Sequence, residues 1–256
     1  MDRETLAAGT AHIAAELRNQ LTQMAAASQV LERTAVTEKD RSYLAVLNQG
    51  ICRMLRIVGR MELAHRLTDE EQIRCFPRDM DLGPWLEELG RRLESVLANI
   101  DVPFTLTCPS HLPVRADGEL LQQMLLELIA NAALAGTRVS LTVAQKDGRV
   151  CFTVSDNGPG VPSDRLDQLF ASSEPGAHYG IALAQRIAEL HGGRLMADPA
   201  PGRGLTMVAA IPLKAGAPGK QLESPRAQWH SGGFDAVLVA MSGLLPAQAF
   251  LPEELG

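Results

Sequence analysis

One short polar motif in the middle of the chain has residue types and spacing that suit the binding of a flat ligand. It is Asp156-Asn157-Gly158-Pro159-Gly160, and it directly follows a strand-like run that ends at Ser155. A carboxylate at a strand end can accept a hydrogen bond from an exocyclic amine, and glycines let backbone approach a flat ligand closely. On its own, the motif is equally compatible with a plain Gly-Pro turn.

A carboxylate and an amide lie upstream of this motif. Glu127 and Asn131 are four residues apart, so a helix places them on one face. Their neighbours Leu125, Leu128 and Ile129 are apolar, and burial of polar groups beside them is costly without partners. A phosphate-bound magnesium ion with its waters would supply such partners. The alternative is a solvated polar edge of an amphipathic helix.

Two glycine-containing loops complete the set. Gly176 and Gly180 precede an expected helix over Ile181–His191, and glycines ahead of a helix N-terminus form a phosphate cradle. The run Pro201–Gly204 precedes the last expected strand. Four features thus follow one another along the chain: an asparagine on a helix, an aspartate after a strand, a glycine-rich loop before a helix and a glycine loop before a strand. Their order is a more specific signal than any one of them.

The elements that position these residues begin with a helical hairpin. Two stripes with alternating spacings of four and three run along the first third of the chain: Leu17, Leu21, Met24, Ser28 and Leu31, then Leu44, Leu47, Ile51, Met54, Val58, Met61 and His65. This heptad pattern is typical of helices in a bundle. Thr37 and Asp40 suit the N-terminus of the second helix. Two helices bury two such stripes poorly, so we expect a homodimer with a four-helix bundle. The alternative is a hairpin packed on its own chain.

The rest of the chain mixes helices and strands. We expect helices over Pro84–Ile100, Asp117–Ala135 and Ile181–His191, and strands over Phe104–Cys108, Val139–Ala144, Val150–Ser155 and Leu205–Leu213. The turn ending in Gly148 joins two strands as a hairpin, and Gly192 ends a helix that His191 caps. The fold class is therefore α+β, with a mixed, antiparallel-rich sheet and helices on one face.

Composition shifts suggest the domain boundaries. We expect a helical hairpin over 1–68, a linker over 69–82, an α/β domain over 83–213, a Gly/Pro/Ser-rich linker over 214–233 and a strand-like tail over 234–256. The run Phe234–Met241 is predicted as a strand that shields the sheet edge, or that offers an apolar surface to a partner.

Composition and charge exclude several classes of protein. The 256 residues are 46% hydrophobic and 21% charged, with a net charge of -6, so a basic nucleic-acid footprint is absent and anionic membranes are unsuited as partners. No signal peptide or membrane span is recognisable. The cysteines are isolated and suit buried thiols in a reducing compartment: Cys52, Cys75, Cys108 and Cys151. We expect a cytoplasmic protein.

At this point the sequence resembles the GHKL ATPases, and within them the sensor histidine kinases. Glu127–Asn131 resembles the N box, Asp156–Gly160 the G1 box, Phe170 the F box and Gly176–Gly180 the G2 box. Residues 11–66 are similar to the dimerisation and histidine-phosphotransfer hairpin. The resemblance covers about four fifths of the chain. It implies a GHKL-type α/β sandwich beside a dimeric four-helix bundle.

The resemblance also implies roles for individual residues. Asn131, beside Glu127, would hold Mg2+, and Asp156 would bind the adenine amine of ATP. Gly158 and Gly160 would shape the adenine pocket, whereas Gly176 and Gly180 would face the phosphates.

The hairpin departs from the family pattern at its reactive position. The family has His-Glu-Leu-Arg-x-Pro-Leu-Thr where this chain has Ala15-Glu-Leu-Arg-Asn-Gln-Leu-Thr22. A methyl group cannot attack a phosphate, so phosphorylation at this position is excluded. Glu16 keeps the acid that helps the family's histidine, and Gln20 replaces its proline. His12 is the candidate substitute, although an ordinary helix histidine is the favoured interpretation.

The nucleotide site also has lost positive charge. Leu134 stands where the family has a basic residue, and Ser173 where short-lid relatives carry a lysine. His178 occupies a common glycine position, and Glu174 adds negative charge, which weakens binding of a triphosphate.

These features favour a degenerate histidine kinase of a two-component or phosphorelay system. It would bind a response regulator or a partner kinase through the bundle, with ATP as a conformational ligand. The hairpin begins almost at residue 1, so we expect no sensor domain on this chain. One alternative is an active ATP-dependent kinase that uses His12 or a histidine on a partner chain. Another is a non-catalytic adaptor with a vestigial pocket.

Overall fold

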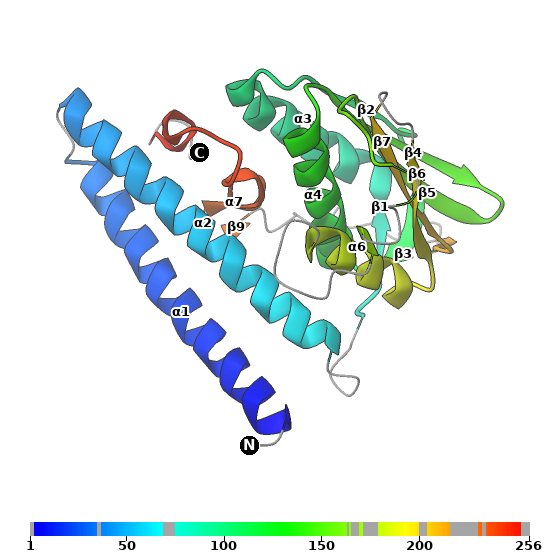
Figure 1. Ribbon diagram of the computed structural model, residues 1–256, viewed down its shortest axis with the longest axis horizontal. Coiled ribbons are helices and arrows are strands. Elements are labelled where there is room, and N and C mark those ends of the chain that lie inside the picture. The colour runs from blue at the N-terminus through cyan, green and yellow to red at the C-terminus, as the bar shows by residue number, and fades with distance from the viewer. Residues whose placement is uncertain are drawn as a thin grey trace. The chain divides into compact units, whose positions relative to one another are not determined.

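The protein has two compact units, each formed by its own set of elements (Figure 1). Unit 1 comprises Met1–Ile73 and Gln228–Gly256, and unit 2 comprises Arg74–Ala227. The structure is a computed structural model that describes residues 3–34, 37–68, 75–162, 164, 169–170, 179–199, 204–215, 230–231 and 234–251.

The expected helical hairpin is confirmed in unit 1. Helix α1 (Arg3–Glu32) pairs with α2 (Glu38–Thr68), and α1 continues through Gln20 without a break. Thr37 and Asp40 form a reciprocal cap: the Thr37 N–H donates to Asp40 Oδ2 at 3.1 Å, and the Asp40 N–H donates to Thr37 Oγ1 at 3.1 Å. These two bonds satisfy backbone donors that the first helical turn leaves open.

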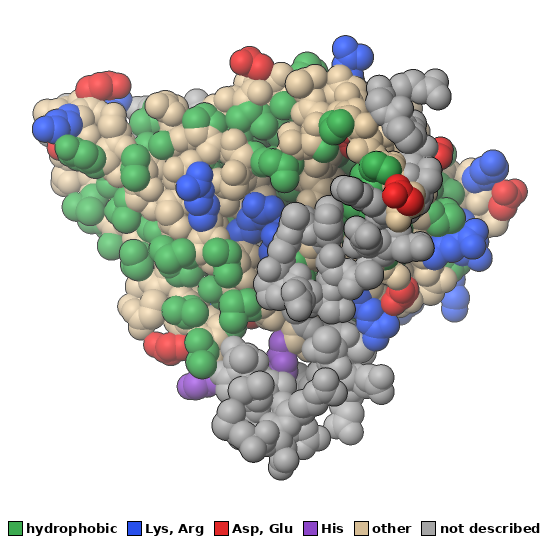
Figure 2. Space-filling view, viewed as in Figure 1, with side chains coloured by type: hydrophobic (Ala, Val, Ile, Leu, Met, Phe, Trp, Pro, Cys, Tyr) green, Lys and Arg blue, Asp and Glu red, His purple; other side chains and the backbone are tan. Residues whose placement is uncertain are grey.

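Each heptad stripe is divided between a buried and an exposed row. Alternate members face the other helix of the hairpin and are buried: Leu21, Ser28, Leu44, Ile51 and Val58. His65, the last member of the second stripe, is half-buried. The remaining members recur every seven residues and are at least 39% exposed: Leu17, Met24, Leu31, Leu47, Met54 and Met61. Hydrophobic side chains accordingly lie along the outside of the hairpin (Figure 2). The hairpin therefore buries only half of its apolar pattern.

The C-terminal part of unit 1 differs from the sequence prediction. After β9 (His230–Ser231) and β10 (Phe234–Asp235), the chain forms α7 (Ala236–Met241) and a 3-10 turn, η3 (Ala247–Phe250). The expected strand over Phe234–Met241 is therefore wrong beyond its first two residues. Asp235 Oδ1 accepts from Val237 N–H at 2.7 Å and Leu238 N–H at 3.1 Å, which starts a helix instead. The tail packs on α2 of the hairpin and does not extend the large sheet.

The main sheet of unit 2 is mixed and mostly antiparallel, as expected. Its order is β2-β4-β5-β7-β6, and only the β2–β4 pair is parallel. The strands are β2 (Phe104–Thr107), β4 (Val139–Lys146), β5 (Arg149–Asp156), β6 (Arg194–Pro199) and β7 (Leu205–Ile211). Asp147 and Gly148 both have positive φ at the β4–β5 turn, which suits a tight hairpin.

A second, smaller sheet includes two segments that the sequence predicts as linkers, which form β1 and β8. Its order is β1-β3-β8, formed by β1 (Arg78–Asp81), β3 (Pro113–Ala116) and β8 (Lys214–Ala215). The expected linkers 69–82 and 214–233 are therefore too long, because each contributes a strand. These strands have two to four residues, and their pairing partners lie far away in the sequence.

Three helices cover one face of the main sheet (Figure 1). They are α3 (Leu82–Leu97), α4 (Gly118–Ala135) and α6 (Tyr179–Leu190), and a 3-10 turn, η1 (Ala98–Ile100), follows α3. Trp85 of α3 and Phe152 of β5 are both fully buried, which places the core between the helices and the sheet. The expected layer of helices on one face is confirmed.

Candidate functional site

Helix α4 presents the expected carboxylate and amide near the core of unit 2. Asp117 begins the helix, because its Oδ1 accepts from the Leu120 N–H at 3.2 Å. Glu127 is 5% exposed, and Asn131 lies one turn further on. The Nδ2 atom of Asn131 is buried, and within the described residues it has no hydrogen-bond partner. A buried amide without a partner is costly and marks a place where a ligand or its waters would complete the bonding.

Asp156 ends strand β5 with one oxygen fixed and one open. Its Oδ1 accepts from the Gly158 N–H at 2.8 Å and from the Leu205 N–H at 3.3 Å. The described residues donate no hydrogen bond to Oδ2. The two backbone bonds hold the carboxylate in one orientation, so Oδ2 is placed to accept from an exocyclic amine.

Two glycines allow the backbone to close tightly around Asp156. A Cβ at Gly158 would lie 2.4 Å from the carbonyl oxygen of Ala135, and one at Gly204 would lie 1.9 Å from the carbonyl oxygen of Asp156. Gly204 also has a φ of 98°, which side-chain-bearing residues rarely adopt. The end of α4, the end of β5 and the start of β7 therefore meet at one point. Only glycine fits at these two positions.

Asn157 is a positioning residue that sequence reasoning missed. Its Oδ1 accepts from the backbone N–H groups of Thr137 and Arg138, each at 2.9 Å. These bonds tie the Asp156 loop to the segment that follows α4. They thereby fix the separation between the carboxylate of Asp156 and the helix that carries Asn131. The sequence offered one signal for this role, the asparagine between Asp156 and Gly158. The role depends, however, on the backbone of Thr137 and Arg138, which precede Asn157 by 20 and 19 residues.

The phosphate side of the site is described only in part. Gly180 is buried in the first turn of α6, and Gly160 has a φ of 70° next to Asp156. Phe170 is half-buried. Leu134 is 69% exposed. The positions Gly176, Ser173, Glu174 and His178 lie outside the described residues.

His191 caps the end of α6, as the sequence predicts, and also contacts the start of α4. Its Nδ1–H donates to the Ile187 carbonyl at 2.9 Å, which leaves Nε2 as an acceptor for the Asp117 N–H at 3.4 Å. Cys75 Sγ lies 3.7 Å from the same Nε2. Burial, and then the Asp117 carboxylate, raise the pKa of the Cys75 thiol. Cys75 is half-buried, and so are Cys108 and Cys151, so only Cys52 is a fully buried thiol.

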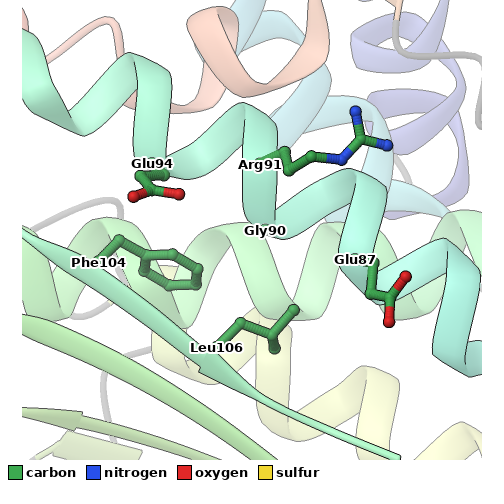
Figure 3. Close-up of a pocket in the computed structure, with 6 residues that line it drawn as sticks. All are labelled: Glu87, Gly90, Arg91, Glu94, Phe104 and Leu106. Carbon is green, nitrogen blue, oxygen red and sulfur yellow. The ribbon is translucent and has the colours of Figure 1, made fainter. Parts of the chain in front are cut away.

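A separate pocket of about 330 Å³ lies between α3 and the edge strand β2 (Figure 3). It is lined by Glu87, Gly90, Arg91, Glu94, Phe104 and Leu106. None of the expected site residues lines this pocket.

In unit 1, the segment Ala15–Thr22 stands where the family has its histidine box, and this altered box begins on an exposed part of α1. Ala15 and Glu16 are both exposed, and Glu16 Oε1 accepts from Gln20 Nε2 at 3.0 Å. His12 is also exposed. The helix leaves the Ala15 position open to an approaching domain, but the side chain there is a methyl group.

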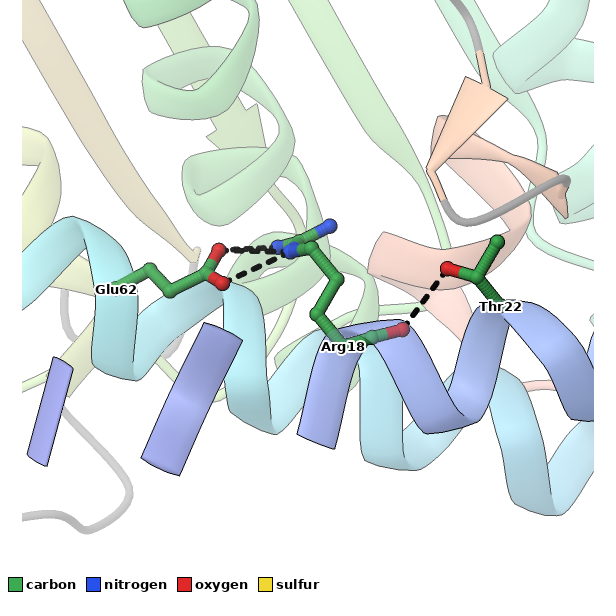
Figure 4. Close-up of polar contacts among 3 residues, drawn as sticks. All are labelled: Arg18, Thr22 and Glu62. Atoms are coloured by element: carbon green, nitrogen blue, oxygen red, sulfur yellow. Dashed lines mark hydrogen bonds and ion pairs between the residues drawn. The ribbon is translucent and has the colours of Figure 1, made fainter. Parts of the chain in front are cut away.

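Arg18 of the same box is held by α2. Its Nε lies 2.9 Å from Oε1 and 2.8 Å from Oε2 of Glu62, and a terminal nitrogen lies 2.5 Å from Oε2 (Figure 4). Both side chains are about 30% exposed. The Thr22 hydroxyl donates to the Arg18 carbonyl at 2.8 Å. A paired, partly buried guanidinium stabilises the register of α1 against α2.

Comparison with known proteins places part of unit 2 in a known family. Residues 116–215 match the family model for histidine kinase-, DNA gyrase B- and HSP90-like ATPases. This range contains Glu127, Asn131, Asp156 and Gly204, the residues that form the site in unit 2. The chain is histidine kinase-like. The resemblance and the helical hairpin followed by an α/β sandwich, both inferred from the sequence, are thus confirmed, and the unit that contains the matched range is named the ATPase domain after this family.

Curated relatives extend the similarity into the hairpin. The chain is 30% identical over 219 residues to sensor histidine kinase ZraS of Klebsiella oxytoca, covering 81% of this chain and 46% of ZraS. It is 26% identical over 220 residues to sporulation kinase D of Bacillus subtilis strain 168, covering 82% and 42%. The chain therefore spans a little under half the length of these relatives.

Solved structures share the fold of a large part of this chain. Full-length ShkA, crystallised in complex with AMPPNP, superposes with a TM-score of 0.67 at 26% identity, over 82% of this chain and 46% of ShkA. The Acinetobacter baumannii histidine kinase AdeS has a TM-score of 0.54 at 19% identity and covers 65% of this chain and 83% of AdeS, which supports the fold alone. Among the described residues, no helix is long and apolar enough to cross a membrane.

Proposed function

We propose that this protein is a degenerate histidine kinase that acts in a two-component or phosphorelay system. One observation carries the proposal: Ala15 lies on an exposed face of α1, whereas backbone N–H groups hold the carboxylate of Asp156 in one orientation. The hairpin then binds a partner without accepting phosphate itself. The partner is a response regulator or another histidine kinase. The protein works in the cytoplasm, with no nucleic acid or membrane as its ligand.

ATP with Mg2+ is the proposed ligand of the ATPase domain. The open Oδ2 of Asp156 suits the adenine amine, and the unpartnered Nδ2 of Asn131 marks a polar site on α4 beside buried Glu127. The side chain of Asn131 can act either as a hydrogen-bond donor or as a metal ligand, because rotation of its amide would present the oxygen to a metal ion. Bound ATP would supply a phosphoryl group. Gly160, Gly176 and Gly180 are the proposed neighbours of that ligand.

A homodimer is the proposed assembly. The exposed rows on α1 and α2 repeat every seven residues on both helices, and a second hairpin would bury them. An exposed apolar surface of this regularity is otherwise rare on a monomer. The dimer would form the four-helix bundle expected from the sequence.

Phosphotransfer to another histidine is the second candidate. His12 is exposed one turn before Ala15, and the ATPase domain retains its adenine-side residues. The domain would then act on His12 or on a histidine of a partner chain, with Glu16 as the acid nearest the acceptor. An adaptor with a vestigial pocket is the remaining alternative.

Nucleotide binding tests the proposal. Calorimetric titration with a non-hydrolysable ATP analogue and Mg2+ is expected to show saturable binding that Asp156→Asn weakens on the order of a hundredfold. The substitution preserves an oxygen for the two backbone donors but places an amide donor against the adenine amine. Asp147→Asn, at the far end of the same pair of strands, is the matched control. Absence of binding by the wild type at millimolar nucleotide would favour the adaptor.

A labelling experiment separates the two kinase hypotheses. Incubation with ATP labelled at the γ-phosphate is expected to leave the wild-type chain unlabelled. Label that appears on the chain and disappears in His12→Ala would overturn the degenerate interpretation and establish His12 as the acceptor.

A further inference from the structure

Strand β2 forms one edge of the main sheet in unit 2. Within the described part of the chain, β2 pairs with β4 on one side and with no strand on the other. The Val139 N–H donates to the Pro103 carbonyl at 3.0 Å, which fixes the phase of the parallel β2–β4 ladder. Bonding groups alternate along a strand, so Thr105 directs its N–H and carbonyl toward β4. Phe104 and Leu106 therefore direct theirs toward the open edge.

The side chains of the same two residues form the apolar wall of the pocket between α3 and β2. Phe104 is buried and Leu106 is half-buried, and both side chains rise from β2 toward α3 (Figure 3). Gly90 stands opposite them on the helix, and a Cβ there would lie 2.7 Å from Leu106 Cδ2. The missing side chain at Gly90 leaves room between helix and strand. One pair of residues thus offers both a pocket wall and open backbone groups.

Two glutamates of α3 border this pocket. Glu87 and Glu94 are seven residues apart, so they lie on the same side of the helix and about 10 Å from each other along its axis. Figure 3 shows one carboxylate on either side of Phe104 and Leu106, whereas the guanidinium of Arg91 points away from them. The apolar wall is therefore flanked by two negative charges.

These two charges are not balanced by the fold. Arg91 forms an ion pair with Glu88, which does not line the pocket. Among the described residues, no side chain forms an ion pair or a hydrogen bond with the carboxylate of Glu87 or Glu94. Burial, and then the Glu87 carboxylate, raise the pKa of the Cys108 thiol just beyond β2. A cation that enters the pocket would gain carboxylate partners without displacing an existing one.

We propose that this edge of unit 2 binds an extended peptide of a partner protein by strand addition. The peptide backbone bonds to the open N–H and carbonyl groups of Phe104 and Leu106. A lysine or arginine of the peptide lays its aliphatic part along Phe104 and brings its charge to Glu87 or Glu94. The same carboxylates repel acidic peptides, so the partner segment is one in which basic residues alternate with small or apolar ones.

The binding of a designed peptide tests the charge requirement. The probe is a short fluorescent peptide that alternates threonine with lysine and valine, and fluorescence anisotropy follows its titration with the full-length protein. We expect saturable binding that the double substitution Glu87→Gln and Glu94→Gln weakens at least about tenfold. The control, Glu119→Gln with Asp147→Asn, removes the same charge elsewhere on unit 2 and should change Kd less than about twofold. Absence of binding, or equal effects of the two double variants, would overturn the proposal.

N-methylated forms of the same peptide test strand addition with the unaltered protein. The N–H groups of a strand point alternately to its two sides, so methylation of one alternate set blocks pairing with β2 and methylation of the other set does not. We expect one methylated peptide to bind at least about tenfold more weakly than the other. Equal affinities would show that only side chains are recognised, as a small cationic molecule would be, and would contradict strand addition.

A proline in β2 tests the phase of the ladder. Leu106→Pro removes an N–H that faces the open edge, so Tm should stay close to that of Leu106→Ala, which removes the side chain alone. The proline variant is expected to bind the peptide at least about threefold more weakly than the alanine variant. A proline variant that unfolds would show that this N–H is bonded within the sheet, and equal affinities would show that it is not used. Either result would refute the proposed pairing.

Discussion

The ATPase domain and the hairpin differ in how much of the family's sequence pattern each one keeps. In the domain, Asp156 is oriented by two backbone donors, and glycines bring three chain segments together around it. In the hairpin, the fold persists through the Thr37 cap and the Arg18–Glu62 pair, whereas the reactive position is a methyl group. Fold and reactivity are thus separable, because helix packing depends on many residues and nucleophilic attack on one.

The largest effect is expected from restoring the missing nucleophile. Ala15→His places an imidazole on an exposed helix face beside Glu16, and we expect label from γ-labelled ATP to appear where the wild type shows none. The label should be acid-labile, as a phosphorylated imidazole is. The double variant with Asp156→Asn is the control and is expected to remain unlabelled.

If Ala15→His stays unlabelled although the nucleotide binds, the comparison between the units changes. The ATPase domain would then have lost its ability to transfer phosphate as well. Its role would be confined to ligand-dependent positioning of the hairpin.

The second prediction compares the effect of one substitution on nucleotide binding with its effect on the stability of the fold. Asn131→Leu removes a buried amide that has no partner among the described residues, so the free energy of unfolding should change by less than about 0.5 kcal/mol or increase. Affinity for Mg2+ with the ATP analogue should fall at least about tenfold. Calorimetry and denaturant unfolding of the same preparation measure the two quantities.

A leucine at position 131 that strongly destabilised the protein would show that Asn131 is a structural residue. Glu119→Gln, at the exposed start of the same helix, is the control for a change of polarity on α4.

Local patterns in the sequence predicted most of the elements correctly. The Thr37 cap, the turn at Gly148 and the helix end at His191 depend on residues within a few positions, and each is present in the structure. Both helices of the hairpin followed from their heptads.

The errors arose where distant residues decide the structure. The run after Phe234 is rich in valine and leucine and resembles a strand, but the Asp235 cap and the surface of α2 make it a helix. Strand β1 exists only because β3 pairs with it. Asn157 acts through the backbone of Thr137, which the sequence pattern does not place nearby.

A smaller effect is expected at the ion pair that holds the hairpin. Glu62→Gln removes the charge opposite Arg18 and should lower the opening free energy of α1 and α2 by about 1 kcal/mol. Hydrogen exchange of their backbone amides, followed by mass spectrometry, measures it. Glu88→Gln breaks the exposed Glu88–Arg91 pair of α3 and should change protection there by less than about 0.5 kcal/mol. Equal effects at both pairs would show that the hairpin pair has no special role.

An effect of similar size, but one that depends on pH, is expected at the cap of α3. Burial of Asp81 raises its pKa, but hydrogen bonds from His111, the Leu112 N–H and the Gly83 N–H outweigh burial, so the pKa is lowered. Because the pKa is lower in the folded state, the charged carboxylate stabilises the fold at pH values above its ordinary pKa of 3.8. This contribution is lost as the pH falls through the folded-state pKa.

Asp81→Ala should therefore cost about 1 kcal/mol at pH 7, with a difference from the wild type that shrinks in acid. Asp81→Asn keeps an oxygen for the two backbone donors and serves as the control for the charge. Denaturant unfolding at pH 7 and near pH 3 measures both differences. A cost for Asp81→Ala that does not change with pH would assign the stabilisation to the capping hydrogen bonds and not to the charge of Asp81.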